Sequence, residues 1–251
     1  MRPIPICAIA ALTALGAGHA LAQEAPAAAE STAGLSANVG LVTLYKYRGQ
    51  DQYIGHSGKE RWLRPAIQGG LDYDFGNGFY VGNWNSSLRL PSSSGTAHAE
   101  MDFYGGYRFE TGPLAWDTGV LRYQYPGAGV LNTTELYAAA SYENVTLKYA
   151  HTVSDRYFGI DDGKGTGYLS LAVSHPLRDD LSLQASVGRT FLDDGAQATS
   201  GYPDYTDYSV GLAWEARPGT TLTAVVVGAD KDDAWGVVNK PKLIVGMKHA
   251  F

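Results

Sequence analysis

The sequence predicts an all-β fold, a transmembrane antiparallel up-and-down β-barrel of about 12 strands with both termini on the periplasmic side. Three observations predict it. Apolar residues recur at every second position through most of the chain, which is the period of a β-strand. The opposite face of the same segments carries many charged residues. The connections between the segments alternate between short and longer ones.

Twelve segments show this alternation. In the second of them, Leu63, Ile67 and Leu71 share one face, whereas Arg64 and Asp72 share the other. The predicted strands are 35–48, 63–75, 79–90, 97–109, 114–125, 132–142, 145–155, 165–174, 181–192, 205–215, 221–230 and 240–251.

Alternation alone does not say which face is inside, since a soluble β-sandwich or a lipocalin-like barrel also alternates, with its apolar set inward. The polar face is too charged for a dry core, because buried unpaired charges cost several kcal/mol each. Its charged residues are Lys46, Arg48, Arg64, Asp72, Asp74, Glu100, Asp102, Arg108, Asp117, Glu135, Lys148, Asp207 and Glu215. Aromatic residues gather near the strand ends, as membrane-interface girdles require: Tyr45, Tyr47, Phe75, Phe79, Phe109, Trp116, Tyr123, Tyr125, Tyr142, Phe191, Tyr208, Trp214 and Phe251. Both features favour an apolar exterior.

The connections support the same fold. The short ones contain Gly, Pro, Asn and Asp, which tight turns need, and they are 76–78, 110–113, 143–144, 175–180 and 216–220. The intervening ones, mostly longer, are 49–62, 91–96, 126–131, 156–164, 193–204 and 231–239. Short periplasmic turns and longer outer loops, with an even number of strands, are typical of outer-membrane barrels. The apolar parity shifts between Val120 and Leu121, which predicts a bulge there.

The N-terminus has the pattern of a targeting segment. Residues 1–22 contain Arg2, an apolar stretch and a small-residue cleavage site, and they predict a secretory signal peptide that also removes Cys7. Residues 23–34 then form a flexible lead-in, and 35–251 form the barrel domain. Loss of Arg2 changes the net charge from −6 to −7, which argues against nucleic acid as a partner.

The final segment resembles the closing strand of bacterial outer-membrane barrels, whose terminal aromatic residue is part of the assembly signal. Leu243, Val245 and Met247 share the face that ends at Phe251. Further motifs resemble the TorF porin family: 41–49 (LVTLYKYRG), 65–70 (PAIQGG), 79–84 (FYVGNW), 100–107 (EMDFYGGY), 123–127 (YQYPG) and 134–137 (TELY). The resemblance implies an outer-membrane barrel of a Gram-negative bacterium, a pore without an established substrate, and recognition of Phe251 by the barrel assembly machinery.

The first candidate site is the lumen. Its candidate pore-lining residues are Lys46, Arg48, Arg64, Asp72, Glu100, Asp102, Arg108, Asp117, Glu135 and Lys148. Basic and acidic side chains that face each other across a lumen create a transverse field that favours small polar or charged solutes. The alternative is that they pair into salt bridges that only stabilise the wall.

The predicted loops are acidic at Asp161-Asp162, at Asp193-Asp194 and in 230–233. Solvated loops explain them best, and Ca²⁺, or Mg²⁺ bridging to lipopolysaccharide, is the alternative. Outer-membrane lipids, lipopolysaccharide and small solutes are the expected partners. The sequence has no motif for a cofactor or a metal.

Catalysis is the least favoured reading. His151 and Ser154 are three residues apart on a strand, so they point to opposite faces and cannot form a nucleophile–base pair. The sequence therefore predicts no enzyme. Three functions stay open: a passive porin, a non-conducting barrel with a structural or surface-binding role, and a lipid-modifying enzyme that uses His151.

Overall fold

The computed structural model describes residues 33–54 and 62–251. The predicted signal peptide and most of the lead-in lie outside the described residues. The elements are β1 (Gly34–Val42), β2 (Lys46–Tyr47), β3 (Gln50–Asp51), β4 (Ala66–Asp74), β5 (Phe79–Ser92), β6 (Gly95–Thr111), β7 (Leu114–Gln124), η2 (Gly129–Leu131), β8 (Thr133–Tyr142), β9 (Val145–Thr152), β10 (Gly167–Arg178), β11 (Leu181–Phe191), α1 (Asp194–Ser200), β12 (Tyr205–Arg217), β13 (Thr220–Ala229), α2 (Asp232–Trp235), η3 (Gly236–Asn239) and β14 (Lys242–Ala250).

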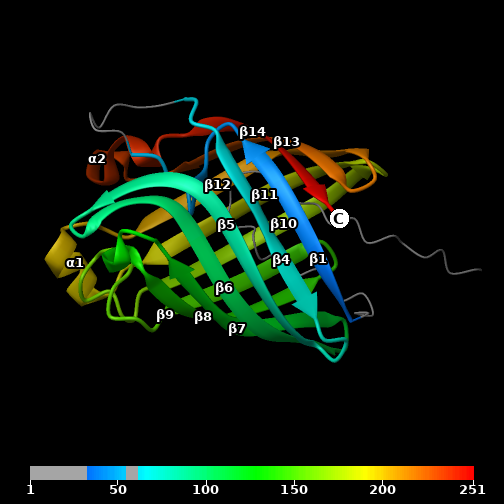
Figure 1. Cartoon of the computed structure of the whole chain (residues 1–251), viewed down its shortest axis with the longest axis horizontal. Coiled ribbons are helices and arrows are strands. Elements are labelled where there is room, and N and C mark those ends of the chain that lie inside the picture. The colour runs from blue at the N-terminus through cyan, green and yellow to red at the C-terminus, as the bar shows by residue number, and fades with distance from the viewer. Residues whose placement is uncertain (1–32, 55–61) are drawn as a thin grey trace, which may run out of the picture.

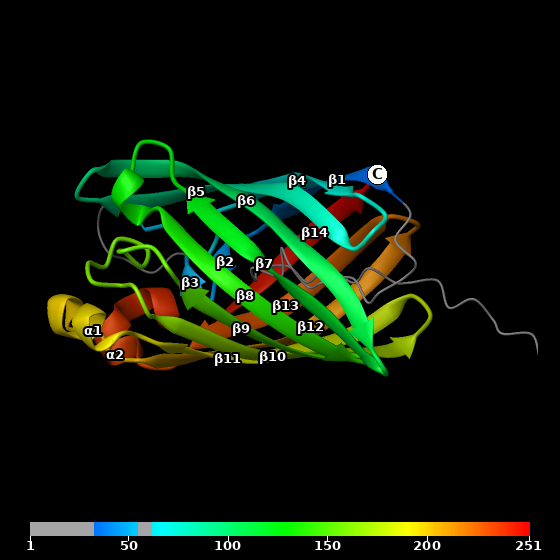
Figure 2. The ribbon, with the colours of Figure 1, turned by 90° about the horizontal axis from the view of Figure 1, so that it is seen from below.

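Twelve of these strands form one closed antiparallel barrel, which confirms the predicted fold (Figure 1). Each strand pairs with its sequence neighbours, and β1 closes the barrel by pairing with β14, with Asn38 opposite Ala250. Helices α1 and α2 lie at the end of the barrel opposite the C-terminus (Figures 1 and 2). Among the described residues, no helix is long and apolar enough to cross a membrane.

The orientation of the faces follows the prediction. Outward side chains are apolar and exposed, for example Ile67 at 65% and Leu71 at 52%. Inward positions on the same strands carry Asp72, Glu100 and other polar groups. Outward aromatic rings stack near the short-turn end: Phe79 on Tyr107, Tyr107 on Phe109, and Phe109 on Trp116. Four predicted girdle residues instead point inward and are buried: Tyr45, Tyr47, Tyr123 and Tyr125.

The first predicted strand is too long. The wall strand ends at Val42, and the chain then turns into the barrel as the short hairpin β2–β3. Arg48 and Gly49 at its tip have φ values of +45° and +77°. Two successive residues in the left-handed region make a tight turn, which glycine adopts at little cost. Alternation continues through 43–48 and therefore hides this departure from the wall.

The predicted bulge is wrong. Strand β7 pairs with β6 and β8 without a break at Val120 and Leu121. The parity shift arises because Leu121 is an apolar residue that faces the interior, where it is buried. The register shifts lie elsewhere, at Ser87/Leu90, Pro176/Arg178 and Glu215/Arg217.

Two predicted connections are shorter than expected. Strands β5 and β6 extend to a two-residue turn between Ser92 and Gly95, so 91–96 is a projecting hairpin tip. Strand β10 continues to Arg178, which narrows the turn predicted at 175–180. Long strands project at one end of the barrel because the pairing of β5 with β6 continues beyond that of their other neighbours.

Inside the wall, tyrosine rings lie over glycines of neighbouring strands. A Cβ added at Gly82 would lie 2.3 Å from Cε2 of Tyr104 and 2.6 Å from Oδ1 of Asp72. The ring is held there because the Tyr104 hydroxyl donates to Asp72 at 2.5 Å. We therefore expect Gly82→Ala to destabilise the barrel by about 1–3 kcal/mol through overpacking.

The matched control is Gly129→Ala, since the nearest atom to an added Cβ there is 3.9 Å away. Urea unfolding of both variants in lipid vesicles, followed by Trp fluorescence, measures the difference. Equal unfolding midpoints for the two variants would contradict the overpacking of Tyr104.

Candidate functional site

The inward hairpin, residues 44–52, fills part of the lumen. Figure 2 shows β2 and β3 inside the outline of the barrel. Leu44, Lys46 and Arg48 are at most 5% exposed, although they belong to a loop. The tip packs against β13, two strands from β1, because a Cβ at Gly49 would lie 2.7 Å from the carbonyl oxygen of Gly228. The hairpin therefore narrows the barrel from within.

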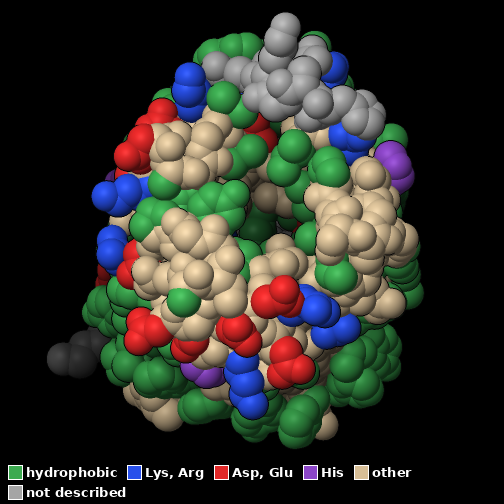
Figure 3. Space-filling model, turned by 90° about the vertical axis from the view of Figure 1, so that its left-hand side faces the viewer, with side chains coloured by type: hydrophobic (Ala, Val, Ile, Leu, Met, Phe, Trp, Pro, Cys, Tyr) green, Lys and Arg blue, Asp and Glu red, His purple; other side chains and the backbone are tan. Residues whose placement is uncertain are grey.

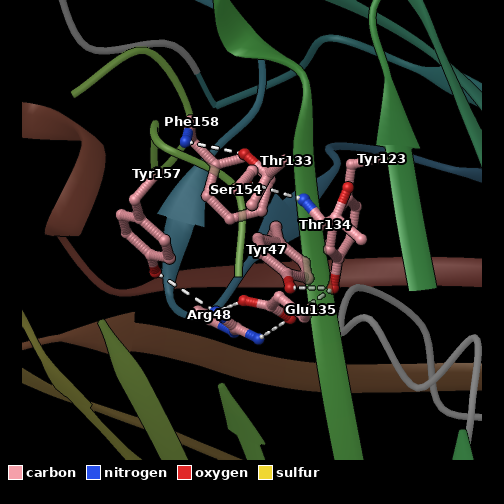
Figure 4. A network of polar contacts seen from close by, with 9 residues as sticks. All are labelled: Tyr47, Arg48, Tyr123, Thr133, Thr134, Glu135, Ser154, Tyr157 and Phe158. Carbon is pink, nitrogen blue, oxygen red and sulfur yellow. Dashed lines mark hydrogen bonds and ion pairs between the residues drawn. The ribbon is translucent and has the colours of Figure 1, made fainter. Parts of the chain in front are cut away.

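Arg48 anchors the tip to β8. Its Nη1 and Nη2 donate to the two carboxylate oxygens of Glu135 at 2.9 and 2.8 Å, a bidentate pair (Figure 4). Nη1 also donates to the Tyr157 hydroxyl at 3.2 Å, and the guanidinium lies 4.1 Å from the ring centre of Tyr168. Burial raises the pKa of Tyr157, so its phenol keeps its proton.

A collar of aromatic rings surrounds this ion pair. Phe158 makes edge contacts with Tyr47, Tyr123 and Tyr157, with ring centres 5.5, 4.9 and 4.8 Å apart. Tyr47 and Tyr123 share a hydrogen bond of 2.5 Å, and Tyr123 donates to Glu135 at 3.2 Å. Rings that are locked by their hydroxyls hold the hairpin in one position.

The loop between β9 and β10 supplies Phe158 to this collar. The backbone N–H of Phe158 donates to Oγ1 of Thr133 at 2.8 Å (Figure 4). In the same loop, Oγ of Ser154 accepts from the N–H of Thr134 at 3.0 Å. Two loops, one after β1 and one after β9, thus meet inside the barrel.

The base of the hairpin is held by a Lys–Asp–Lys cluster. Asp51 pairs with Nζ of Lys46 at 2.8 Å and with Nζ of Lys242 on β14. Lys46 also donates to the carbonyl oxygen of Val238 at 2.7 Å, and Gln50 to Asn239 at 2.9 Å. These contacts join the hairpin to the loop that precedes β14.

On the β6 side, two carboxylates have a different environment. The Tyr45 hydroxyl donates to Oε1 of Glu100 at 3.2 Å, and the ring of Tyr45 packs on Trp84 at 5.6 Å. In the described part of the chain, Oε2 of Glu100 and Oδ1 of Asp102 have no hydrogen-bond partner.

A second polar cluster contains Arg108. Its guanidinium lies 3.5 Å from Asp74, 3.9 Å from Asp117 and 3.8 Å from the ring centre of Tyr80. Tyr80 donates to Asp117 at 2.6 Å. Lys148 lies 4.5 Å from the ring centre of Tyr137, whose hydroxyl also contacts Tyr80.

The structure thus resolves how the predicted lumen charges are arranged. Of the predicted basic and acidic lumen residues, Arg48 and Glu135 form a direct pair. Lys46 instead pairs with Asp51 of its own hairpin. Arg64 lies beside the ring of Tyr53, at 5.2 Å, where the chain returns to the wall. That these residues line a conducting pore stays a prediction.

Sequence reasoning missed several residues of the site. Asp51 lies in the predicted connection 49–62, and Lys242 is not among the predicted pore-lining residues. The inward role of Tyr45 and Tyr47 was missed because they were assigned to the girdle. The alternating charge of Lys242 within β14 was the one available signal.

The outer loops show no assembled metal site. Within residues 33–54 and 62–251, no group of three or more His, Cys, Asp or Glu side chains is placed to hold a metal. Asp161 pairs with Arg156 at 2.5 Å, and Asp193 caps α1 through the N–H of Gly195.

The histidine and serine considered for catalysis are separate. Nδ1 of His151 contacts the Tyr149 hydroxyl at 3.3 Å, whereas Ser154 bonds only to backbone groups in the contacts described. They do not form a pair.

The end of the barrel that carries α1 and α2 is hollowed. Figure 3 shows a recess at its centre, with hydrophobic side chains within it and acidic and basic side chains around the lower rim. The inward hairpin and the Phe158 collar lie inside the wall beneath this loop end. A solute entering the barrel from this side would meet them.

Solved porin structures share this fold. The chain is similar to the KdgM porin, with a TM-score of 0.55 and 8% identity over 86% of this chain and 99% of the porin. It is also similar to the NanC porin, with a TM-score of 0.54 and 9% identity over 87% and 99%. A structure of the KdgM porin in complex with disordered oligogalacturonate aligns with a TM-score of 0.52 and 8% identity over 86% and 98%. At these identities the likeness establishes the fold.

The sequence comparisons place the chain in a family. No curated protein matches the chain significantly. The family model that matches is described as "Bacterial protein of unknown function (Gcw_chp)", over residues 26–251, and the resemblance to TorF stays a prediction. Because this match covers most of the chain, the protein belongs to the Gcw_chp family of bacterial proteins, with the barrel fold of outer-membrane porins.

Proposed function

We propose that this chain is an outer-membrane porin of the kind that the TorF-like motifs imply, a passive diffusion channel for small hydrophilic or charged solutes. One observation carries the proposal: a closed barrel with an apolar exterior encloses a charged interior. Lipid around the wall would stabilise the apolar exterior, and water within the lumen would stabilise the charged interior. The porin fold of KdgM and NanC supports it.

The location follows from the same features. The signal peptide would direct the chain across the inner membrane, and Phe251 would be read by the assembly machinery of the outer membrane. Short turns at the terminal end support periplasmic termini, and the loop end with α1 and α2 would face outward toward lipopolysaccharide.

The inward hairpin would set the selectivity of this pore. Twelve strands enclose a lumen whose width is intermediate between that of filled eight-stranded barrels and that of open sixteen-stranded porins. The hairpin would reduce the width of the lumen further, and its contacts with Glu135 and Glu100 support a narrowing beside these residues and Arg48. Solutes would pass down their gradient and be screened by width and charge, without energy input.

Single-channel recording tests the proposal. The refolded mature chain in a planar lipid bilayer should give discrete current steps in a salt gradient. The refolding detergent alone is the control for leaks. A difference in gel mobility between unheated and heated protein establishes that the barrel has folded. Folded protein that gives no steps would contradict the proposal.

One observation favours a second candidate, a non-conducting barrel with a structural or surface-binding role: the hairpin and the Phe158 collar occupy the lumen. The projecting β5–β6 tip and α1 would then be the functional surface. Binding of folded protein to lipopolysaccharide vesicles that is lost on replacement of α1 would support this role. No observation favours an enzyme.

A further inference from the structure

Glu100 and Asp102 are neighbours on the inner face of β6. Residues two apart on a strand point to the same side, about 6.6 Å apart along it. Both are buried, at 1% and 3% exposure. Across β5 they face Ser86 and Trp84. The two carboxylates therefore lie side by side within the lumen.

These two carboxylates lack the cationic partners that Glu135 and Asp51 have. Glu135 pairs with Arg48, and Asp51 pairs with two lysines. In contrast, Glu100 receives the Tyr45 hydroxyl, and neither it nor Asp102 forms a salt bridge within the described residues. One oxygen of each has no donor. Two adjacent buried carboxylates are unfavourable when both are ionised, so either a shared proton or a bound cation has to offset their repulsion.

We propose that Glu100 and Asp102 form a binding site for a metal cation inside the lumen, beside the inward hairpin. Carboxylate oxygens are the ligands that hard cations such as Ca²⁺ prefer. The protein supplies two carboxylates rather than a full ligand set, so water completes the coordination and the ion exchanges. Such a site suits a permeant ion. The inference rests on the proposed function for its role, since the ion would bind on the path of the solutes.

Terbium luminescence tests the site without requiring conduction. Tb³⁺ prefers oxygen ligands, as Ca²⁺ does, and emits when a nearby Tyr or Trp is excited; Tyr45 and Trp84 are in contact beside the site. The mature chain is refolded with Tb³⁺ present, so that entry does not depend on an open pore. We expect saturable emission that Ca²⁺ displaces.

Variants assign the emission to the pair. Glu100→Gln with Asp102→Asn keeps the side-chain shapes and should remove most of the emission. The matched control, Asp232→Asn with Asp233→Asn, removes the same charge from the exposed first turn of α2 and should leave it unchanged. The site would be overturned if the folded wild-type barrel gave no saturable Tb³⁺ emission, or if both double variants gave equal emission. The two carboxylates would then share a proton.

The role in conduction is measured separately. In a salt gradient, Glu100→Gln with Asp102→Asn should shift the reversal potential toward anion preference relative to wild type. Tb³⁺ emission without any channel current would support the cation site and contradict the proposed porin function. If the double variant conducts with an unchanged reversal potential, the cation site does not lie on the solute path, whereas the proposed porin function stands.

Discussion

Removal of the inward hairpin is expected to raise single-channel conductance several-fold. Replacing residues 44–52 by a short Gly-Ser linker takes the Lys46, Tyr47 and Arg48 side chains out of the lumen, where they are buried. Conductance depends on the narrowest section of a wet pore, and the hairpin tip reaches the wall at Gly228. Water would enter the freed space and solvate Glu135 and other groups that the hairpin now contacts. Planar-bilayer recording measures the change.

The control for this deletion replaces α1 (Asp194–Ser200) with a linker of the same composition. This helix lies at the loop end and makes no hydrogen bond or ion pair with Arg48 in the contacts described, although its Ala196 packs in the cluster that contains Tyr157. Its loss should change conductance little. Equal conductance in the wild type and the hairpin variant, with both folded, would show that the constriction lies elsewhere in the lumen.

Loss of the Glu135 charge is expected to destabilise the hairpin, because it leaves the Arg48 guanidinium buried without its carboxylate. Breaking one side of a buried pair costs roughly 3–5 kcal/mol. Glu135→Gln should therefore lower the urea midpoint of the barrel or release the hairpin, which would appear as larger and noisier current steps. The bidentate geometry at 2.8 and 2.9 Å makes this the hairpin contact with the largest expected effect.

A double-mutant cycle separates the pair from other effects. Arg48→Met combined with Glu135→Gln removes both charges and should cost less than Glu135→Gln alone, since no unpaired charge stays buried. Asp180→Asn, which breaks the exposed pair with Arg178, is the surface control and should have no measurable effect. Additive costs of the two single changes would show that Arg48 and Glu135 do not stabilise each other.

Local patterning explains why most of the fold is predictable. Each wall strand alternates, so the twelve strands and the face on which Asp72, Glu100 and Arg108 lie follow from period two alone. The apolar exterior follows from charge, because so many ionised groups need water or partners. These are properties of short segments, and the sequence of each segment contains them.

The alternation of apolar residues gave a wrong strand prediction where a segment alternates but leaves the barrel wall. Residues 43–48 alternate like a strand, yet they turn inward after Val42. Leu121 disturbs the parity of β7 because it is an apolar residue on the inner face. In both cases the environment is set by chain from elsewhere in the barrel, which a local window does not contain.

The sequence by itself determined the barrel, its polarity and most of the charged residues that point inward. Only the tertiary structure decided which of them meet. Arg48 reaches Glu135 87 positions away, and Lys242 reaches Asp51 across 191. Such contacts exist only after β1 has closed on β14 and the hairpin has entered the lumen, because closure fixes the distance between opposite walls. The narrowing of the lumen is therefore a property of the closed barrel and of no single segment.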